Sequence, residues 1–273
     1  MSDPESVIRT TLLSQPLREP VLRSAIKALE LPSGSRGLDA GCGTGLQTIL
    51  LAEHVGPDGS ITGLDRSPEL LDYANNAVQK ARMPDTIAFR EGDINAIPFN
   101  DDTFDWAWSA DCIGYIPADP LPMLQELARV VRPGGTVAIT AWSSEKLLPG
   151  YPLLEARLDA TKSGMAPFLE RNGPERHFPR SLGWLRQAGF VGLKAATFSG
   201  QAYAPLTDEM YTALAVLFKM RWEGVESELA DEDREAFLRL SDPESEAFIL
   251  HHPDYYAFFS YSMFHGKVPG ETT

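Results

Sequence analysis

The sequence is poor in cysteine and in positive charge, and it contains no long hydrophobic run. Its 273 residues include two cysteines, Cys42 and Cys112, too few for a disulfide framework and without CxxC spacing. No stretch reaches the roughly 18 consecutive apolar residues that mark a transmembrane helix. The N-terminus carries Asp3 and Glu5 where a signal peptide would be basic. We therefore expect a soluble, cytoplasmic protein without a membrane span.

The charge balance argues against a nucleic-acid partner. Lysine and arginine total 24 against 38 aspartate and glutamate residues, a formal net charge of −14. A chain of that charge is repelled by a phosphate backbone unless it carries a local basic patch, and no basic run is present. The acidic stretch 223–235 is interpreted as a solvated helix face.

Strand and helix patterns alternate along the first half of the chain. Residues 1–19 show weak periodicity, and 21–30 carry a clear helical stripe. Buried or alternating strand patterns are then separated by helical stripes, which predicts βαβ units and a mostly parallel sheet with helices on both faces. Strands are predicted at 37–40, 60–65, 87–90, 104–109 and 136–142, and helices at 46–52, 68–82 and 121–131.

A glycine-rich turn follows the first predicted strand and contains Gly41, Gly43 and Gly45. Between a strand and a helix, such a turn brings backbone N–H groups and a helix N-terminus up to a ligand. Asp39 precedes the turn, and Asp65 ends the next strand, where a carboxylate can accept both hydroxyls of a ribose. The pattern predicts a nucleoside-containing ligand.

The spacing of the turn separates the candidate cofactors. A nicotinamide dinucleotide favours G-x-G-x-x-G, whereas this turn reads G-x-G-x-G. The carboxylate of Asp39 would repel a pyrophosphate, and it suits a ligand with an ammonium and a sulfonium group. The Tyr-x-x-x-Lys proton relay of an oxidoreductase is also missing. An NAD(P)-dependent oxidoreductase is therefore the less favoured alternative.

Five segments carry motifs in a set order. They are LDAGCGTG at 38–45, TGLDRS at 62–67, EGDINAIPF at 91–99, FDWAWS at 104–109 and LARVVRPGG at 127–135. Together they resemble the motifs of class I S-adenosylmethionine-dependent methyltransferases, over residues 20–142 and more loosely over 181–197 and 256–267. The resemblance implies a Rossmann-like, doubly wound α/β fold with a mostly parallel seven-stranded sheet.

The resemblance also implies S-adenosyl-L-methionine as cofactor and S-adenosyl-L-homocysteine as product. It places the backbones of Gly41 and Gly43 beside the methionine part of the cofactor. Asp39 would organise the turn and favour the ammonium group, and Asp65 would bind the ribose diol.

The same resemblance assigns the other end of the cofactor. Arg66 would lie along the adenine, Asp93 would accept a hydrogen bond from its amino group, and the Ile94 backbone would meet the ring edge. Ser109 occupies the position whose backbone carbonyl lies near the reacting methyl group. Without the resemblance, each aspartate would also suit a helix N-cap.

The methyl acceptor is less well defined. The segment after the fourth predicted strand lacks the N/D-P-P-Y/F motif of enzymes that methylate amino groups of nucleic acids and glutamine, and two cysteines are fewer than arsenic methylation uses. A small-molecule acceptor remains. His177 is the candidate general base, with a turn cap as the alternative, and Tyr115 is a candidate acceptor-site residue. No third ligand accompanies His251 and His252, so we expect no metal site.

The alternation loosens after Trp142, and the remaining segments are rich in aromatic residues. We predict N-terminal helices and a cofactor-binding core at 1–142, an insertion at 143–180, core at 181–197, a helical lid at 198–254, and a last strand and tail at 255–273. An aromatic lid favours an apolar or aromatic acceptor.

The predicted function is in-line methyl transfer from the cofactor to a small molecule through a carbon, oxygen or nitrogen atom. A cofactor-binding partner protein without catalysis is the other alternative.

Overall fold

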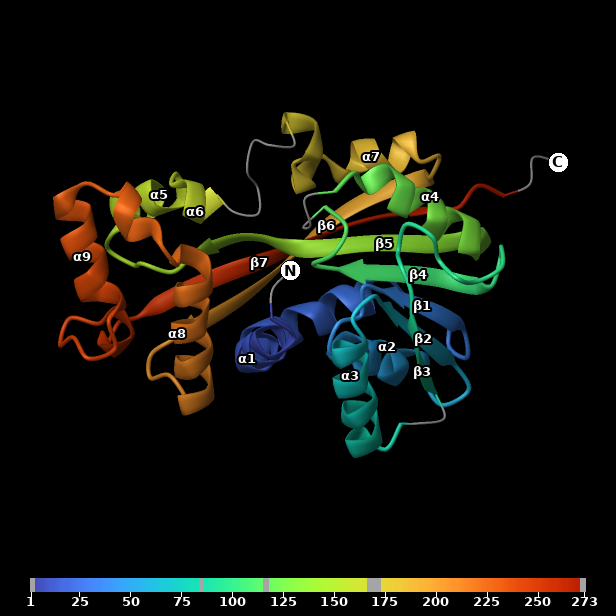
Figure 1. Ribbon diagram of the computed structural model, residues 1–273, viewed down its shortest axis with the longest axis horizontal. Helices are drawn as coiled ribbons and strands as arrows, with labels where there is room; N and C mark the ends of the chain where they lie inside the picture. The colour runs from blue at the N-terminus through green and yellow to red at the C-terminus, as the bar shows by residue number, and fades with distance from the viewer. Residues whose placement is uncertain (1–2, 84–85, 115–117, 166–172, 271–273) are drawn as a thin grey trace.

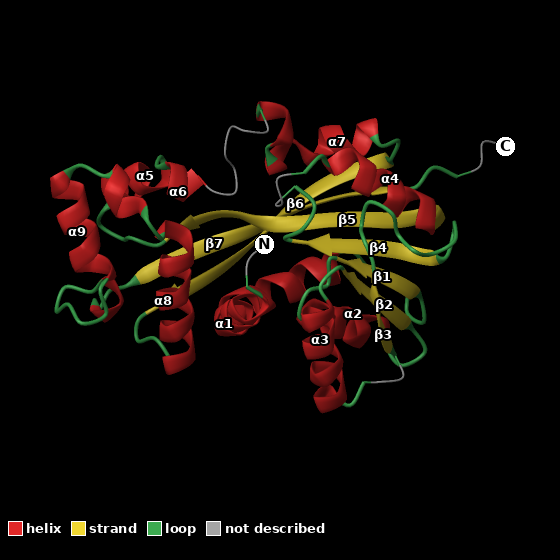
Figure 2. Ribbon diagram, in the orientation of Figure 1, coloured by secondary structure: helices red, strands yellow, loops and turns green. Residues whose placement is uncertain are grey.

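The computed structural model describes residues 3–83, 86–114, 118–165 and 173–270. Its centre is a sheet in the order β3-β2-β1-β4-β5-β7-β6 (Figures 1 and 2). The first five strands of that order run parallel, and β7 is antiparallel to both β5 and β6. This arrangement confirms the predicted mostly parallel, seven-stranded α/β fold. The strands are β1 Arg36–Ala40, β2 Ser60–Asp65, β3 Ile87–Glu91, β4 Phe104–Ala110, β5 Val131–Lys146, β6 Val191–Tyr203 and β7 Tyr256–Lys267.

Helices cover both faces of the sheet, as predicted (Figure 2). One face carries α1 Pro4–Ala28, α2 Leu46–Val55 and α3 Pro68–Ala81, and the other carries α4 Pro120–Val130 and α7 Ser181–Gln187. Each face has its own apolar core. Leu127 and Trp184 lie in the core under α4 and α7, whereas Leu51 and Trp106 lie in the core under α1 and α2.

Helix α1 is longer than its sequence pattern predicts. The weak periodicity of residues 1–19 reflects two prolines inside the helix, Pro16 and Pro20. An internal proline removes a backbone hydrogen bond, so packing has to hold the helix together. That packing is supplied by Leu17, Val21 and Ala25, which are almost completely buried. The helix contacts β6, β7 and α8, elements that lie far away in the sequence.

Three strands extend beyond the parallel part of the sheet. Strand β5 pairs with β7 as far as Lys146 and Phe258, and β6 pairs with β7 as far as Tyr203 and Tyr256. Four helices surround these strand ends (Figure 1): α5 Pro152–Asp159, α6 Lys162–Met165, α8 Asp208–Trp222 and α9 Asp231–Ser241. We call these strand ends and helices the arm.

The arm shares its interior with the core under α1. Leu214, Trp222 and Phe248 of the arm belong to the same buried cluster as Val21. Strands β5 and β6 run across positions 142 and 197 without a break. Neither strand ends at those positions, and the division of the chain predicted there stays a prediction.

Candidate functional site

The turn after β1 leaves open space beside its backbone. Gly41 and Gly43 have φ values of +80° and +52°, which side chains other than glycine rarely adopt. A Cβ atom at Gly41 would lie 2.7 Å from the Sγ atom of Cys112, so that position requires glycine. A Cβ atom at Gly43 would meet no atom within 4 Å. A ligand can therefore approach the backbone at Gly43, where the sequence predicts the methionine part of the cofactor.

Asp65 joins the end of β2 to this turn. Its Oδ2 atom accepts a hydrogen bond from the Gly43 N–H at 2.9 Å, and its Oδ1 atom accepts one from the Ser67 N–H at 3.0 Å. The side chain is half-buried at the carboxyl edge of the sheet. The structure thus brings together Asp65 and the glycine turn, and ribose binding by Asp65 stays a prediction.

Asp39 is a buried carboxyl group at the end of β1, with 2% of the residue exposed. Its Oδ2 atom accepts a hydrogen bond of 2.7 Å from the Thr48 hydroxyl on α2. Burial raises the pKa of Asp39 to about 7, the nearby charge of Asp65 adds to the rise, and the Thr48 hydrogen bond opposes it. Near neutral pH this carboxyl group is poised between its two forms, and a cation placed beside it would favour the ionised form.

The residues predicted to meet the adenine lie after β2 and β3. Asp93 accepts hydrogen bonds from the backbone and side-chain nitrogens of Asn95, at 2.8 and 2.9 Å. These bonds and the charge of Arg66 lower the pKa of Asp93. Arg66 and Asp93 are exposed and Ile94 is buried. Asp93 stabilises its own turn, no helix begins at this position to need an N-cap, and adenine binding stays a prediction.

The tip of β4 is fixed to the neighbouring strand. Ser109 is buried, and its hydroxyl donates a hydrogen bond of 2.8 Å to the carbonyl oxygen of Ala40 at the end of β1. Tyr115 lies outside the described residues. His177 lies at an exposed position between the short helices Pro174–Arg176 and Phe178–Arg180. The roles of both residues in catalysis stay predictions.

A cluster of charged and polar groups at the tip of β4 was missed by the sequence reasoning. Arg18 of α1 forms an ion pair with Asp111, and its Nε atom donates to the Tyr261 hydroxyl at 2.7 Å. That hydroxyl donates to Asp111 Oδ2 at 2.9 Å, and Asp111 Oδ1 accepts from the Trp142 N–H at 3.0 Å. Burial raises the pKa of Tyr261, so this hydroxyl keeps its proton.

No local motif marks this cluster, since its members come from α1, β5, β7 and the residue that follows β4. The structure itself gives one sign that Asp111 is unusual, in its backbone conformation. Its φ of +49° is uncommon outside glycine, and such conformations gather at functional sites.

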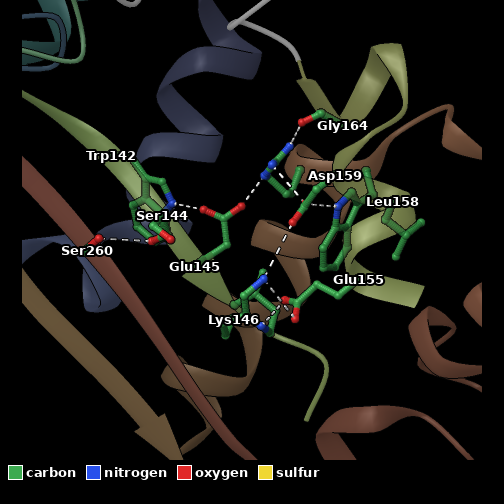
Figure 3. Close-up of polar contacts among 12 residues, drawn as sticks. Trp142, Ser144, Glu145, Lys146, Glu155, Leu158, Asp159, Gly164 and Ser260 are labelled. Carbon is green, nitrogen blue, oxygen red and sulfur yellow. Dashed lines mark hydrogen bonds and ion pairs between the residues drawn. The ribbon is translucent and has the colours of Figure 1, made fainter. Parts of the chain in front are cut away.

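A second polar network joins β5 to the arm (Figure 3). The Trp142 indole donates to Glu145 Oε2 at 2.5 Å, and Glu145 forms an ion pair with Arg221 of α8. Arg221 also donates to the Gly164 carbonyl and, at 3.1 Å, to Asp159 Oδ1. Trp142 therefore connects the Asp111 cluster, through its backbone N–H, to the helices of the arm, through its side chain.

Two features are absent from the described part of the chain. No group of three or more histidine, cysteine, aspartate or glutamate side chains there is placed to hold a metal ion. None of its helices has the length and apolar character needed to cross a membrane.

Comparisons with known proteins agree with this geometry. Residues 38–135 match the model of a methyltransferase domain. The chain is 38% identical to the demethylmenaquinone methyltransferase of Lysinibacillus sphaericus over 126 residues, 46% of this chain and 52% of that protein. The corresponding enzyme of Staphylococcus carnosus is 30% identical over 192 residues, 65% of this chain and 77% of that protein. The chain thus spans about half the length of the first of these relatives.

The fold has counterparts among solved structures. An S-adenosylmethionine-dependent methyltransferase from Aquifex aeolicus superposes with a TM-score of 0.52 at 20% identity, over 96% of this chain and 99% of that one. At that identity the likeness concerns the fold alone.

Proposed function

Since the chain belongs to the class I S-adenosylmethionine-dependent methyltransferases, we propose that it transfers a methyl group from S-adenosylmethionine to a small apolar or aromatic molecule. One observation carries the proposal. The open backbone at Gly43 and the Asp65 carboxylate meet at the carboxyl edge of the sheet, directly joined by a hydrogen bond of 2.9 Å. Ligands of open α/β sheets bind at this edge.

The residues at this edge fit the proposed cofactor. Gly43 would pass its backbone along the methionine part, Asp39 would face the ammonium group, and Asp65 would accept from the ribose hydroxyls. Below neutral pH the Asp39 carboxyl group is mostly protonated, because burial raises its pKa to about 7. A cationic ligand would stabilise its charged form, whereas a pyrophosphate would not. When bound, S-adenosylmethionine supplies an electrophilic methyl group.

What the chain's own residues contribute is chiefly placement. In-line displacement at an activated methyl group requires two substrates held in line, and holding reactants in the right geometry can lower a barrier by several kcal/mol. Ser109 and Ala40 fix the tip of β4 against β1, so the floor of the site is rigid. A base, if the acceptor needs one, is proposed to be His177 or Tyr115.

Two observations support an apolar, ring-bearing acceptor. The side chain of Trp142, near the tip of β4, stacks on Phe259 with ring centroids 4.9 Å apart and meets Tyr261 edge-on at 5.5 Å. The curated relatives act, by name, on demethylmenaquinone, a quinone and so a ring-bearing molecule. We therefore propose an aromatic acceptor, with a ring carbon as the favoured atom.

Calorimetric titration tests the proposal at its base. S-adenosylhomocysteine should bind with a Kd in the micromolar range, about −8 kcal/mol, and NAD should not bind. Methyl-labelled S-adenosylmethionine should then label a compound in a panel of hydroxylated aromatic molecules. Binding of NAD without binding of S-adenosylhomocysteine would contradict the proposal. Binding of S-adenosylhomocysteine without transfer to any aromatic acceptor would favour the partner-protein alternative.

A further inference from the structure

Arg18 is an arginine held in place by partners that use only part of its hydrogen-bonding capacity. Its Nε atom donates to the Tyr261 hydroxyl, and its Nη2 atom donates to Asp111. Among the described residues, no partner is recorded for its Nη1 atom, which carries two further N–H groups. The described part of the chain also contains no buried side-chain nitrogen or oxygen without a partner. Among the described residues, nothing therefore takes up the Nη1 edge of Arg18, whose side chain is 18% exposed.

The residue that holds Arg18 follows the tip of β4, the strand end proposed to lie near the methyl group of the cofactor. Asp111, which holds Arg18, comes two residues after Ser109, whose hydroxyl is bonded to the end of β1. The next residue, Cys112, packs against Gly41 so closely that a Cβ atom there would clash. Asp111 thus holds the guanidinium group of Arg18 at the segment that follows β4, and the next residue of that segment contacts the glycine turn.

The cluster of Arg18, Asp111 and Tyr261 fixes the orientation of the guanidinium group and adds little to stability. The Arg18 side chain is 18% exposed and that of Asp111 is 16% exposed, so both charges have lost most of their water. A largely buried ion pair gains little net stability over apolar residues of similar volume. The cluster is nevertheless fully connected: Asp111 accepts on both carboxylate oxygens, and its backbone adopts a φ of +49°. Such an arrangement fixes the plane of the guanidinium group.

We propose that Arg18 is an acceptor-binding residue whose Nη1 edge donates hydrogen bonds to an oxygen atom on the ring of an aromatic acceptor, with Asp111 and Tyr261 as its positioning residues. This assignment rests on the proposed function and narrows its substrate class from aromatic compounds to hydroxylated or oxo-substituted ones. Where that oxygen is a hydroxyl group that loses its proton, a cationic donor beside it would stabilise the phenolate, whose ring carbons are more nucleophilic than those of the neutral phenol.

A matched pair of probes isolates the oxygen. 1-Naphthol and naphthalene differ by one hydroxyl group, so the ratio of their affinities reports what the protein offers to that oxygen. Equilibrium dialysis of both probes, with and without saturating S-adenosylhomocysteine, should show that the wild-type protein prefers 1-naphthol by at least about tenfold, as expected for a hydrogen bond to a charged group.

The test variant is Arg18→Met combined with Asp111→Asn, so that neither charge is left buried alone. We expect its preference for 1-naphthol to fall to threefold or less, with affinity for S-adenosylhomocysteine within threefold of wild type. Arg23→Met is the matched control, since Arg23 lies on the same helix but is 47% exposed and pairs with Glu19 and Glu53. Its preference should equal that of wild type.

Arg18→Lys keeps the ion pair but lacks the planar fork, and it covers the case in which the double variant does not fold. Its preference should fall at least threefold. An unchanged preference in the variants, or a wild-type protein that binds naphthalene as well as 1-naphthol, would overturn the assignment. Failure of S-adenosylhomocysteine to bind would instead contradict the proposed function, because the probe ratio is also measured without it.

Discussion

The carboxyl edge of the sheet at Gly43 and Asp65 is the proposed cofactor site, and we call it the cofactor edge. The cofactor edge and the arm use polar residues in opposite ways. At the cofactor edge, the turn after β1 and the Asp65 carboxylate are joined by bonds between neighbouring strand ends, and open space remains beside Gly43. In the arm, Arg221 of α8 pairs with Glu145 of β5 and with Asp159 of α5. The cofactor edge leaves polar groups open to a ligand, whereas in the arm the polar side chains bond to other parts of the protein.

The difference teaches where affinity and where stability should reside. A residue at the cofactor edge contributes little packing, so its loss should be felt mainly by the ligand. A residue in the arm network holds buried partners, so its loss should be felt mainly by the fold. Variants of the two regions are therefore compared by their affinity for S-adenosylhomocysteine and by their stability.

The largest effect is expected from Arg221→Met in the arm. It leaves the buried Glu145 carboxylate without its cationic partner, with the Trp142 indole still donating to it, and the Gly164 carbonyl without the Arg221 donor. This should lower the free energy of unfolding by about 3–5 kcal/mol in urea denaturation. The affinity for S-adenosylhomocysteine should stay within twofold. The control is Arg239→Met on the exposed face of α9, which should change stability by less than about 0.5 kcal/mol. A parallel loss of affinity would show that the two regions are coupled.

Asp65→Ala should have the reverse signature. It removes the proposed acceptor of the ribose hydroxyls and should weaken S-adenosylhomocysteine binding by about 1–3 kcal/mol in calorimetry. The melting temperature without ligand should barely move, because the carboxylate makes two hydrogen bonds and little packing. Asp72→Ala, at an exposed position on α3, is the control. Normal affinity together with a collapse of the ligand-free protein would make Asp65 a structural residue.

The pH dependence of binding should reveal Asp39. Its folded-state pKa of about 7 lies above the ordinary value of 3.8. Its protonation therefore stabilises the fold fully below pH 3.8, and this contribution is lost as the pH rises through 7. A bound ammonium group favours the ionised form, so affinity for S-adenosylhomocysteine should rise about tenfold between pH 6 and 8.

Asp39→Asn should flatten both of these pH profiles, of affinity and of stability. The substitution keeps an acceptor for the Thr48 hydroxyl, so the connection to α2 survives. A pH profile that keeps its slope in this variant would assign the titration to another group.

The smallest effect is expected from His177→Ala. The imidazole lies at an exposed position, where water competes for any proton that it handles. We expect single-turnover methyl transfer within twofold of wild type, once an acceptor is known. A loss of tenfold or more, with cofactor affinity unchanged and with His177→Gln behaving alike, would establish the general base instead.

The same contrast explains how much the sequence could predict. The parallel strands, the glycine turn and the place of Asp65 depend on short segments whose patterns are local, and the structure has them where they were expected. Arg18, Asp111 and Tyr261 are separated by 93 to 243 residues along the chain, so no spacing rule connects them. The far end of β5 was missed because its residues 143–146 are polar and lack the apolar run of a buried strand. The first half of α1 was missed because tertiary packing, not periodicity, supports it.

The unbroken course of β5 and β6 into the arm bears on how this protein could be redesigned. A substrate-recognition region that is joined to a core by two short linkers can be exchanged as one unit between relatives. Here the chain enters the arm along β5, leaves it, returns along β6 and leaves again along β7. Both β5 and β6 pair with β7 from the core into the arm, with one register shift in each pairing. A graft that replaces one inserted segment would leave strands of two parents to find a common register. Transfer of acceptor preference from one relative to another should therefore succeed only when all three strand ends are moved together.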